Sequence, residues 1–138
     1  MDIRYPALVE RQGDGTYLVR FIDLDDTFTE GLTQEEALFN AAEVLSAMLA
    51  WRLDASKDVP TPSLKVEGAH YITPDAKTQA AMLLRLARGE RTLADLARAL
   101  ETSWPAARHL EDPTHWPSLK TLERAAAALG KRLVLTLE

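Results

Sequence analysis

The chain has 138 residues, of which 46% are hydrophobic and 27% charged, the balance of an ordinary soluble globular protein. It contains no cysteine, which excludes disulfides and thiolate metal sites. No apolar run approaches the roughly 18 residues of a membrane-spanning helix, and the first residues lack the basic and apolar regions of a secretory signal. These features favour a cytoplasmic protein.

The net charge of −5 is unevenly distributed along the chain. Residues 1–74 carry 6 basic and 13 acidic side chains, a balance of −7, whereas residues 75–138 carry 10 and 8, a balance of +2. This asymmetry predicts two domains, 1–74 and 75–138, with a basic partner for the first and nucleic acid for the second. The alternative is that surface charge differs between two small domains without functional meaning.

Residues 1–74 combine strand-forming runs with one strong helix signal. Two apolar and aromatic runs flank a glycine-containing connection, an arrangement typical of a β-hairpin. Thr33 and Glu36 have capping-box spacing at the start of an amphipathic helix. Pro6 has no backbone N–H, so we expect it at a sheet edge or with its nitrogen facing outward. The predicted elements are strands at 3–10, 16–22 and 27–30, a helix at 33–54, a loop at 55–68 and a strand at 69–73.

Residues 75–138 are predicted to be helical until the last eight residues. Thr92 and Asp95 have capping-box spacing, Ser118 is a typical N-cap, and Gly89 and Gly130 are typical of helix ends. The predicted elements are helices at 75–88, 92–100, 103–111 and 118–129, followed by a strand at 131–138.

The segment 93–110 has the spacing of a helix-turn-helix, in which a second helix presents its outer face to the DNA major groove. We place four residues on that face and five at flanking helix starts that could contact phosphate. The predicted face residues are Trp104, Pro105, Arg108 and His109, and the predicted flanking residues are Arg91, Thr92, Ser103, Ser118 and Lys120.

A helical bundle without DNA contacts is the alternative for this segment. The turn position usually held by glycine is Glu101, although that position requires a positive φ angle. Trp104, Pro105 and Ala106 occupy the face where Gln, Asn or Arg commonly read base edges.

The last predicted strand has no neighbouring strand in the second domain. Its residues alternate, with Leu133, Leu135 and Leu137 on one face and Val134 and Thr136 on the other. A lone strand cannot satisfy its own backbone groups, so it must pair with another copy of the chain or with the first domain's sheet. We favour pairing between copies, which gives a two-fold homodimer with paired helix-turn-helix units; a tetramer is the further alternative.

Several segments together resemble one protein family over essentially the whole chain. These segments are Tyr5-Pro6-Ala7, Asp14-Gly15, Phe21-Ile22-Asp23-Leu24, the run from Glu30 to Ala41, Pro60-Thr61-Pro62-Ser63, Leu122-Glu123-Arg124-Ala125 and the run from Ala128 to Leu133. The sequence is similar to HicB-type antitoxins that have a C-terminal helix-turn-helix domain.

The resemblance implies an α+β protein. Its first domain would have a partial ribonuclease-H-like βββαβ fold, and its second would be an all-α helix-turn-helix domain. Such antitoxins neutralise HicA, a small basic ribonuclease toxin, and repress their own operon by DNA binding. The sequence departs from the family's usual Phe-Pro-Asp-Leu-Pro-Gly turn at Ile22, Asp25 and Asp26, which makes this loop more acidic.

The acidic turn suggests how a toxin is bound. A ribonuclease attracts RNA with a basic surface, and an acidic protein can compete for that surface. We predict that Asp23, Asp25, Asp26 and Glu30 contact the toxin. The alternative is a solvated turn.

The sequence does not predict an enzyme. The three clustered aspartates lie in one turn, whereas a two-metal site needs carboxylates that converge from separate elements. His70, His109 and His115 do not have metal-ligand spacing. We therefore predict no catalytic residue, metal or cofactor. The alternative function is a stand-alone transcriptional regulator whose first domain senses a ligand or a protein.

Overall fold

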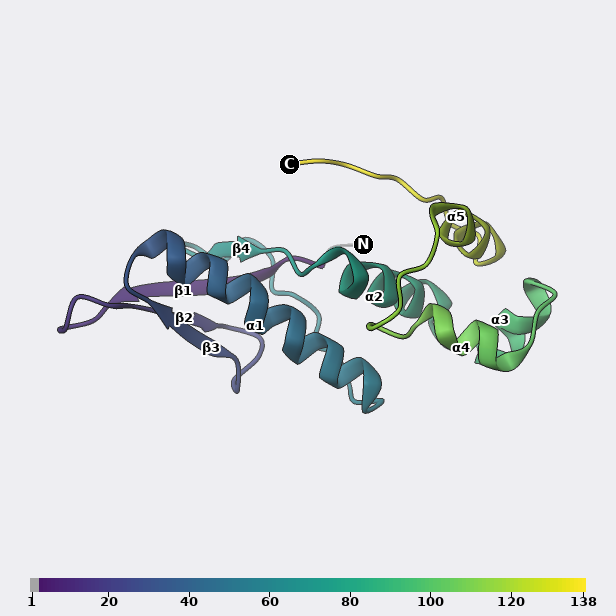
Figure 1. Cartoon of the computed structure of the whole chain (residues 1–138), viewed down its shortest axis with the longest axis horizontal. Coiled ribbons are helices and arrows are strands. Elements are labelled where there is room, and N and C mark those ends of the chain that lie inside the picture. The colour runs from purple at the N-terminus through teal and green to yellow at the C-terminus, as the bar shows by residue number, and fades with distance from the viewer. Residues whose placement is uncertain (1–2) are drawn as a thin grey trace.

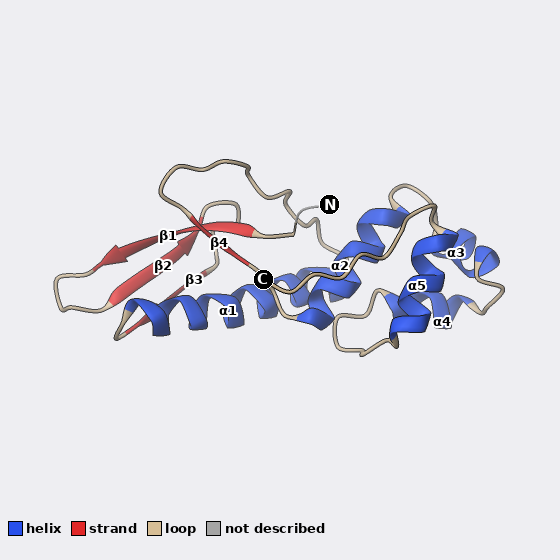
Figure 2. Ribbon diagram, turned by 90° about the horizontal axis from the view of Figure 1, so that it is seen from above, coloured by secondary structure: helices blue, strands red, loops and turns tan. Residues whose placement is uncertain are grey.

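The computed structural model describes residues 3–138 (Figure 1). A four-stranded antiparallel sheet and one long helix form one end of the molecule, and shorter helices form the other (Figures 1 and 2). The elements in chain order are β1 (Tyr5–Arg11), β2 (Tyr17–Phe21), β3 (Phe28–Gly31), α1 (Gln34–Asp54), β4 (His70–Ile72), α2 (Ala76–Arg88), α3 (Leu93–Ala99), α4 (Trp104–Leu110) and α5 (Leu119–Ala128). The predicted α+β class is confirmed, and none of the described helices is long and apolar enough to cross a membrane.

The sheet has the strand order β3-β2-β1-β4, so β1 lies between two partners. The expectation that Pro6 lies at an edge is therefore wrong: Pro6 is buried in β1, opposite Tyr71 of β4. Its carbonyl accepts a hydrogen bond from the N–H of Ile22 at 3.1 Å, just beyond the last residue of β2. The missing proline N–H thus falls at the end of the ladder, where it costs the sheet one bond.

Helix α1 packs along one face of the sheet (Figure 2). Thr33 begins it, because the Thr33 hydroxyl accepts the N–H of Glu36 at 3.1 Å. Alternate residues of β1 and β2 meet its apolar side. The resulting core contains Tyr5, Ala7, Val19, Phe21, Ala37, Ala41, Leu45 and Leu49. At Gly31 the β3 backbone approaches α1 so closely that an added Cβ would lie 2.4 Å from the backbone nitrogen of Ala37.

Helix α2 joins the two ends of the molecule. Ala81 and Met82 belong to the core beneath the sheet, whereas Leu84 belongs to the core of the shorter helices. The Ser46 hydroxyl of α1 accepts the backbone N–H of Asp75, which in turn caps α2. The two ends therefore share one helix and meet through direct contacts.

The second core is formed by small and branched apolar residues from four helices. Its buried members are Leu84, Leu96, Ala97, Ala107, Leu110, Ala125 and Leu129. All four predicted helices of this half are confirmed to within a few residues at each end. Residues 131–138, predicted as a strand, are extended but form no ladder with any strand of the described chain. The alternative in which this segment joins the first domain's sheet is therefore wrong within one chain, and pairing between copies stays a prediction.

Candidate nucleic-acid and partner-binding surfaces

A tight turn with a left-handed residue connects α3 to α4. The N–H of Glu101 bonds the Arg98 carbonyl at 3.1 Å, and the N–H of Thr102 bonds the Ala97 carbonyl at 2.9 Å. This pair of bonds is a Schellman motif, which ends a helix with one residue at positive φ. That residue is Glu101, with φ of 54°. The turn thus has the geometry that glycine normally provides, although the sequence places glutamate there.

The outer face of α4 is exposed and largely apolar. Trp104 is 51% exposed, and Pro105 and Ala106 are exposed beside it. Arg108 is half-buried, and His109 is exposed. The structure therefore brings the predicted face residues together on one short helix, while Ala107 and Leu110 pack in the core.

His109 belongs to a small polar cluster at the end of α4. Its ring centroid lies 4.0 Å from that of His115, and its Nδ1 atom lies 4.0 Å from a carboxylate oxygen of Asp112. Hydrogen bonds from Thr114, together with both histidines, lower the pKa of the Asp112 carboxyl. His109 is thus held near the end of the helix by its neighbours.

Three of the predicted flanking residues are helix N-caps, whose hydroxyl groups accept backbone N–H groups of the helix. Ser103 and Ser118 accept the N–H groups of residues three positions later at 3.2 and 3.1 Å. Thr92 forms a full capping box with Asp95, both bonds being 3.0 Å long. These hydrogen bonds lower the pKa of the Asp95 carboxyl. Lys120 is exposed on the first turn of α5, so its ammonium group stays accessible.

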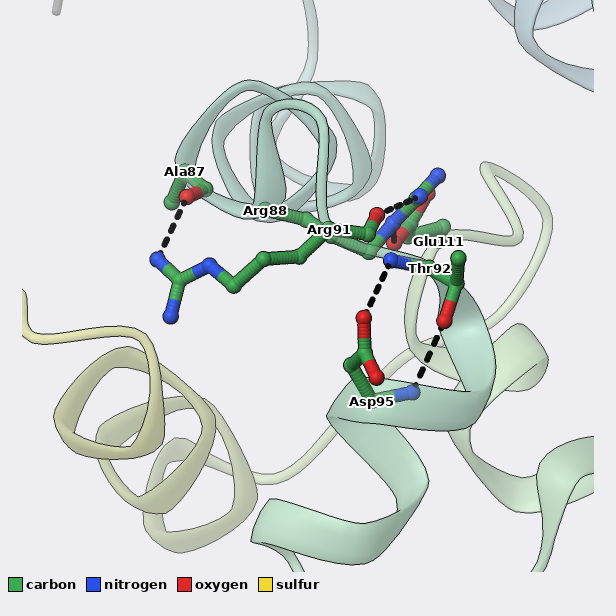
Figure 3. A network of polar contacts seen from close by, with 6 residues as sticks. All are labelled: Ala87, Arg88, Arg91, Thr92, Asp95 and Glu111. Carbon is green, nitrogen blue, oxygen red and sulfur yellow. Dashed lines mark hydrogen bonds and ion pairs between the residues drawn. The ribbon is translucent and has the colours of Figure 1, made fainter.

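A buried ion pair holds the end of α2 against the end of α4 (Figure 3). The Arg88 guanidinium donates to both carboxylate oxygens of Glu111 at 2.6 and 3.0 Å and to the Arg91 carbonyl at 2.6 Å. Glu111 is only 6% exposed, and its carboxylate raises the pKa of Arg88. Sequence reasoning missed this pair because the two residues are 23 positions apart and neither belongs to a recognisable motif.

Arg91 ties α2 to α5. Its guanidinium donates to the carbonyls of Leu129 at 3.1 Å and Ala87 at 3.4 Å, the second bond being drawn in Figure 3. Both acceptors are helix-end carbonyls, which favour a cation. A phosphate contact by the Arg91 guanidinium would therefore compete with its hydrogen bonds to these two carbonyls.

The four predicted toxin-binding acids differ in what they contact. Asp23 accepts the backbone N–H of Ser63 at 2.8 Å and its hydroxyl at 2.5 Å, which fastens the proline-containing loop to the turn after β2. Asp26 lies 3.5 Å from the Arg52 guanidinium. Asp25 and Glu30 are exposed. The structure thus gives Asp23 a role in the fold and leaves the other carboxylates at the surface.

Tyr5 of β1 also binds the proline-containing loop. Its hydroxyl donates to the Pro60 carbonyl at 2.6 Å. Burial, with the nearby negative charge of Asp23 as the second cause, raises the pKa of Tyr5 to about 12. The neutral hydroxyl is therefore the form that the fold requires.

Exposed aromatic and apolar side chains accompany the acids around β3 and α1. Phe28, Leu32 and Phe39 are each more than half exposed. Exposed acids, Glu30, Glu35, Glu36 and Glu43, lie in the same stretch of chain. Sequence reasoning assigned no function to these apolar residues, because their exposure follows only from the fold.

The C-terminal segment is extended and exposes its leucines. Val134, Leu135 and Leu137 are all more than half exposed, whereas Leu133 is half-buried. The segment runs from α5 back toward the sheet (Figure 1), and Glu138 forms an ion pair with Arg4 at 3.3 Å. In the described part of the chain, no three His, Cys, Asp or Glu side chains are grouped as metal ligands would be.

Comparisons with known proteins place the chain among antitoxins. Residues 4–80 match the family described as HicB-like antitoxin of bacterial toxin-antitoxin systems. Antitoxin HicB 2 of Photorhabdus laumondii is 29% identical over 134 residues, covering 97% of this chain and 96% of the relative. Antitoxin HicB of Escherichia coli K12 is 28% identical over 137 residues, covering 98% and 99%. Antitoxin HicB of Pseudomonas fluorescens is 27% identical over 135 residues, covering 96% and 92%.

Proposed function

The chain belongs to the HicB-like antitoxin family of bacterial toxin–antitoxin systems, and from that premise we propose that it binds and neutralises a HicA-type ribonuclease toxin and represses its own operon. In this proposal it is a non-catalytic cytoplasmic protein with two binding surfaces. Residues 1–74 bind the toxin, and residues 75–138 bind operator DNA as part of a homodimer. The observation that carries the proposal is the family match, because it covers the whole sheet with α1.

Toxin binding is supported by the charge of the first half. Its balance of −7 suits a nuclease surface that must attract RNA. Asp25 and Glu30 are the predicted contacts best placed for it, since both are exposed and neither is a helix cap or a loop anchor. Asp26 can contribute only by sharing its carboxylate with Arg52.

DNA binding is supported by the geometry of α3 and α4. Two short helices joined by a Schellman turn present an exposed second helix, as a helix-turn-helix requires. Arg108 and His109 supply a cationic and a polar group on that helix, and Lys120 is exposed at the start of α5. The leucines of residues 131–138 would supply the dimer contact by pairing with the same segment of a second copy.

Co-expression tests toxin binding directly. The chain is produced together with the small basic protein encoded by the neighbouring reading frame, and we expect rescue of growth and co-purification of the two proteins. Charge reversal at both Asp25 and Glu30 is expected to weaken the complex, most strongly at low salt. Glu123→Lys, an exposed site on α5, is the control for charge alone. A neighbouring protein that neither harms growth nor co-purifies with the wild-type chain would contradict toxin binding.

Binding to duplexes from the DNA upstream of the reading frame tests repression. Arg108→Ala is expected to cost about 1–3 kcal/mol on the specific duplex. Leu135→Asp is expected to give monomers in analytical ultracentrifugation. Because a monomer has a single helix-turn-helix, the same variant is expected to bind DNA more weakly. DNA binding by the chain, combined with a neighbouring protein that does not associate with it, would favour the alternative function, a stand-alone transcriptional regulator.

A further inference from the structure

The exposed face of α4 lacks the side chains that usually read bases by hydrogen bonding. Trp104, Pro105 and Ala106 are consecutive, apolar and exposed. Gln, Asn and Arg identify adenine or guanine through paired hydrogen bonds, which none of these three residues can form. The Trp104 indole is 51% exposed and belongs to neither core of the described chain. It therefore offers an apolar contact surface.

A cationic group beside this face suits a nucleic acid better than an apolar partner. Arg124 of α5 lines a hollow of about 220 Å3 together with Ala106 of α4. Lys120 is exposed one turn earlier on α5. Glu101 also lines the hollow, so its carboxylate would face the bound DNA. The Asp95 carboxylate at the start of α3 is already paired with Arg98.

Thymine is distinguished in the major groove by its C5-methyl group, which apolar side chains contact. We propose that α4 selects its operator by packing Trp104 and Pro105 against thymine methyl groups, while Arg124, which lies beside Ala106, contacts the adjacent phosphate. This inference rests on the proposed DNA binding and adds the base chemistry that the site recognises. It also assigns Arg124, which the sequence did not single out, to the DNA surface.

Replacing thymine by deoxyuridine removes only the methyl group and so tests the contact. Duplexes that tile the DNA upstream of the reading frame are first screened with the full chain by fluorescence anisotropy. The bound duplex is then prepared again with deoxyuridine in place of thymine. We expect affinity to fall about fourfold for each contacted methyl group, the value for burying one such carbon. Two half-sites in a dimer complex give about a fifteenfold loss.

Two tryptophan variants give the matched comparison. Trp104→Ala is expected to weaken binding to the thymine duplex and to bring the thymine-to-uracil affinity ratio toward one. Trp116→Ala removes another exposed indole of the same half and is expected to keep the wild-type ratio. Circular dichroism checks that both variants fold. Arg124→Ala is expected to weaken binding to the thymine and uracil duplexes equally and to lower the salt dependence of binding.

The outcomes separate this inference from the proposed function. Equal affinity of the wild-type chain for the thymine and uracil duplexes overturns methyl recognition but leaves DNA binding intact. Failure to bind any upstream duplex overturns DNA binding itself, and the inference falls with it. If Trp104→Ala leaves DNA binding unchanged and alters the oligomeric state instead, the face is a protein interface and the inference is wrong.

Discussion

Replacing Glu101 by glycine should stabilise the protein, because the turn holds a glutamate in the left-handed region at φ of 54°. For a residue with a Cβ that conformation costs roughly 1–2 kcal/mol. Glycine removes this cost but loses about 0.5–1 kcal/mol more chain entropy on folding. The difference predicts that Glu101→Gly raises the free energy of unfolding by about 0.5–1 kcal/mol.

Urea denaturation followed by circular dichroism measures this change, with thermal unfolding as a second measurement. A gain of that size corresponds to a rise in Tm of about 2–4 °C for a chain of this length. Glu101→Ala is the control for loss of the charge, since alanine keeps the unfavourable backbone conformation and should change stability little. Thr102→Gly is the control for added chain entropy and should destabilise.

Gly130 provides the reverse experiment at the end of α5. It has φ of 71°, and an added Cβ would meet nothing within 4 Å. Gly130→Ala should therefore destabilise by about 1 kcal/mol through the backbone alone. If Glu101→Gly is no more stable than the wild type while Gly130→Ala behaves as expected, the argument that the α3–α4 turn stores backbone strain is refuted.

Three further changes test the packing, a buried hydroxyl and the buried ion pair. Gly31→Ala places a Cβ 2.4 Å from the backbone nitrogen of Ala37 in α1 and should cost about 3 kcal/mol or more. Gly13→Ala meets nothing within 4 Å and should be nearly neutral in the same denaturation assay. The pKa of Tyr5 is raised from 10.0 to about 12, so the stability that its neutral form provides is complete below pH 10 and is lost as the pH rises to about 12. Tyr5→Phe should therefore remove this fall in the urea midpoint of unfolding between pH 10 and 12. Glu111→Ala leaves the Arg88 guanidinium buried without its carboxylate and should cost about 3 kcal/mol, and a double-mutant cycle with Arg88→Met should show strong coupling between the two residues.

Local signals predicted the elements well. Thr33, Thr92 and Ser118 each cap a helix in the structure, as their positions in the sequence indicated. A cap depends on bonds between residues three positions apart, so its sequence signature lies within one turn. The predicted hairpin and the fourth strand are confirmed for the same reason, since alternation and turn residues are local properties.

Features that depend on distant pairing could not be predicted. Asp23 meets Ser63 across 40 residues, and Arg88 meets Glu111 across 23. No local pattern encodes either contact, because each partner alone has the properties of an ordinary surface residue. The missing N–H of Pro6 predicts a sheet edge or an outward-facing nitrogen, but the end of the β1–β2 ladder, inside the sheet, also limits the loss to one bond.

The packing of α2 bears on how the half proposed to bind the toxin can be isolated. Charge and composition place a boundary between residues 74 and 75, yet Ala81 and Met82 of α2 are only 1% and 2% exposed in the core beneath the sheet. Removing both side chains from that core should cost about 3 kcal/mol, a large part of the 5–15 kcal/mol that stabilises a typical domain. The family match also continues to residue 80, inside this helix. A fragment of residues 1–88 should therefore unfold cooperatively in urea and keep toxin binding, whereas residues 1–74 should lack a cooperative transition. Equal stability of the two fragments would mean that α2 contributes little to the sheet's core.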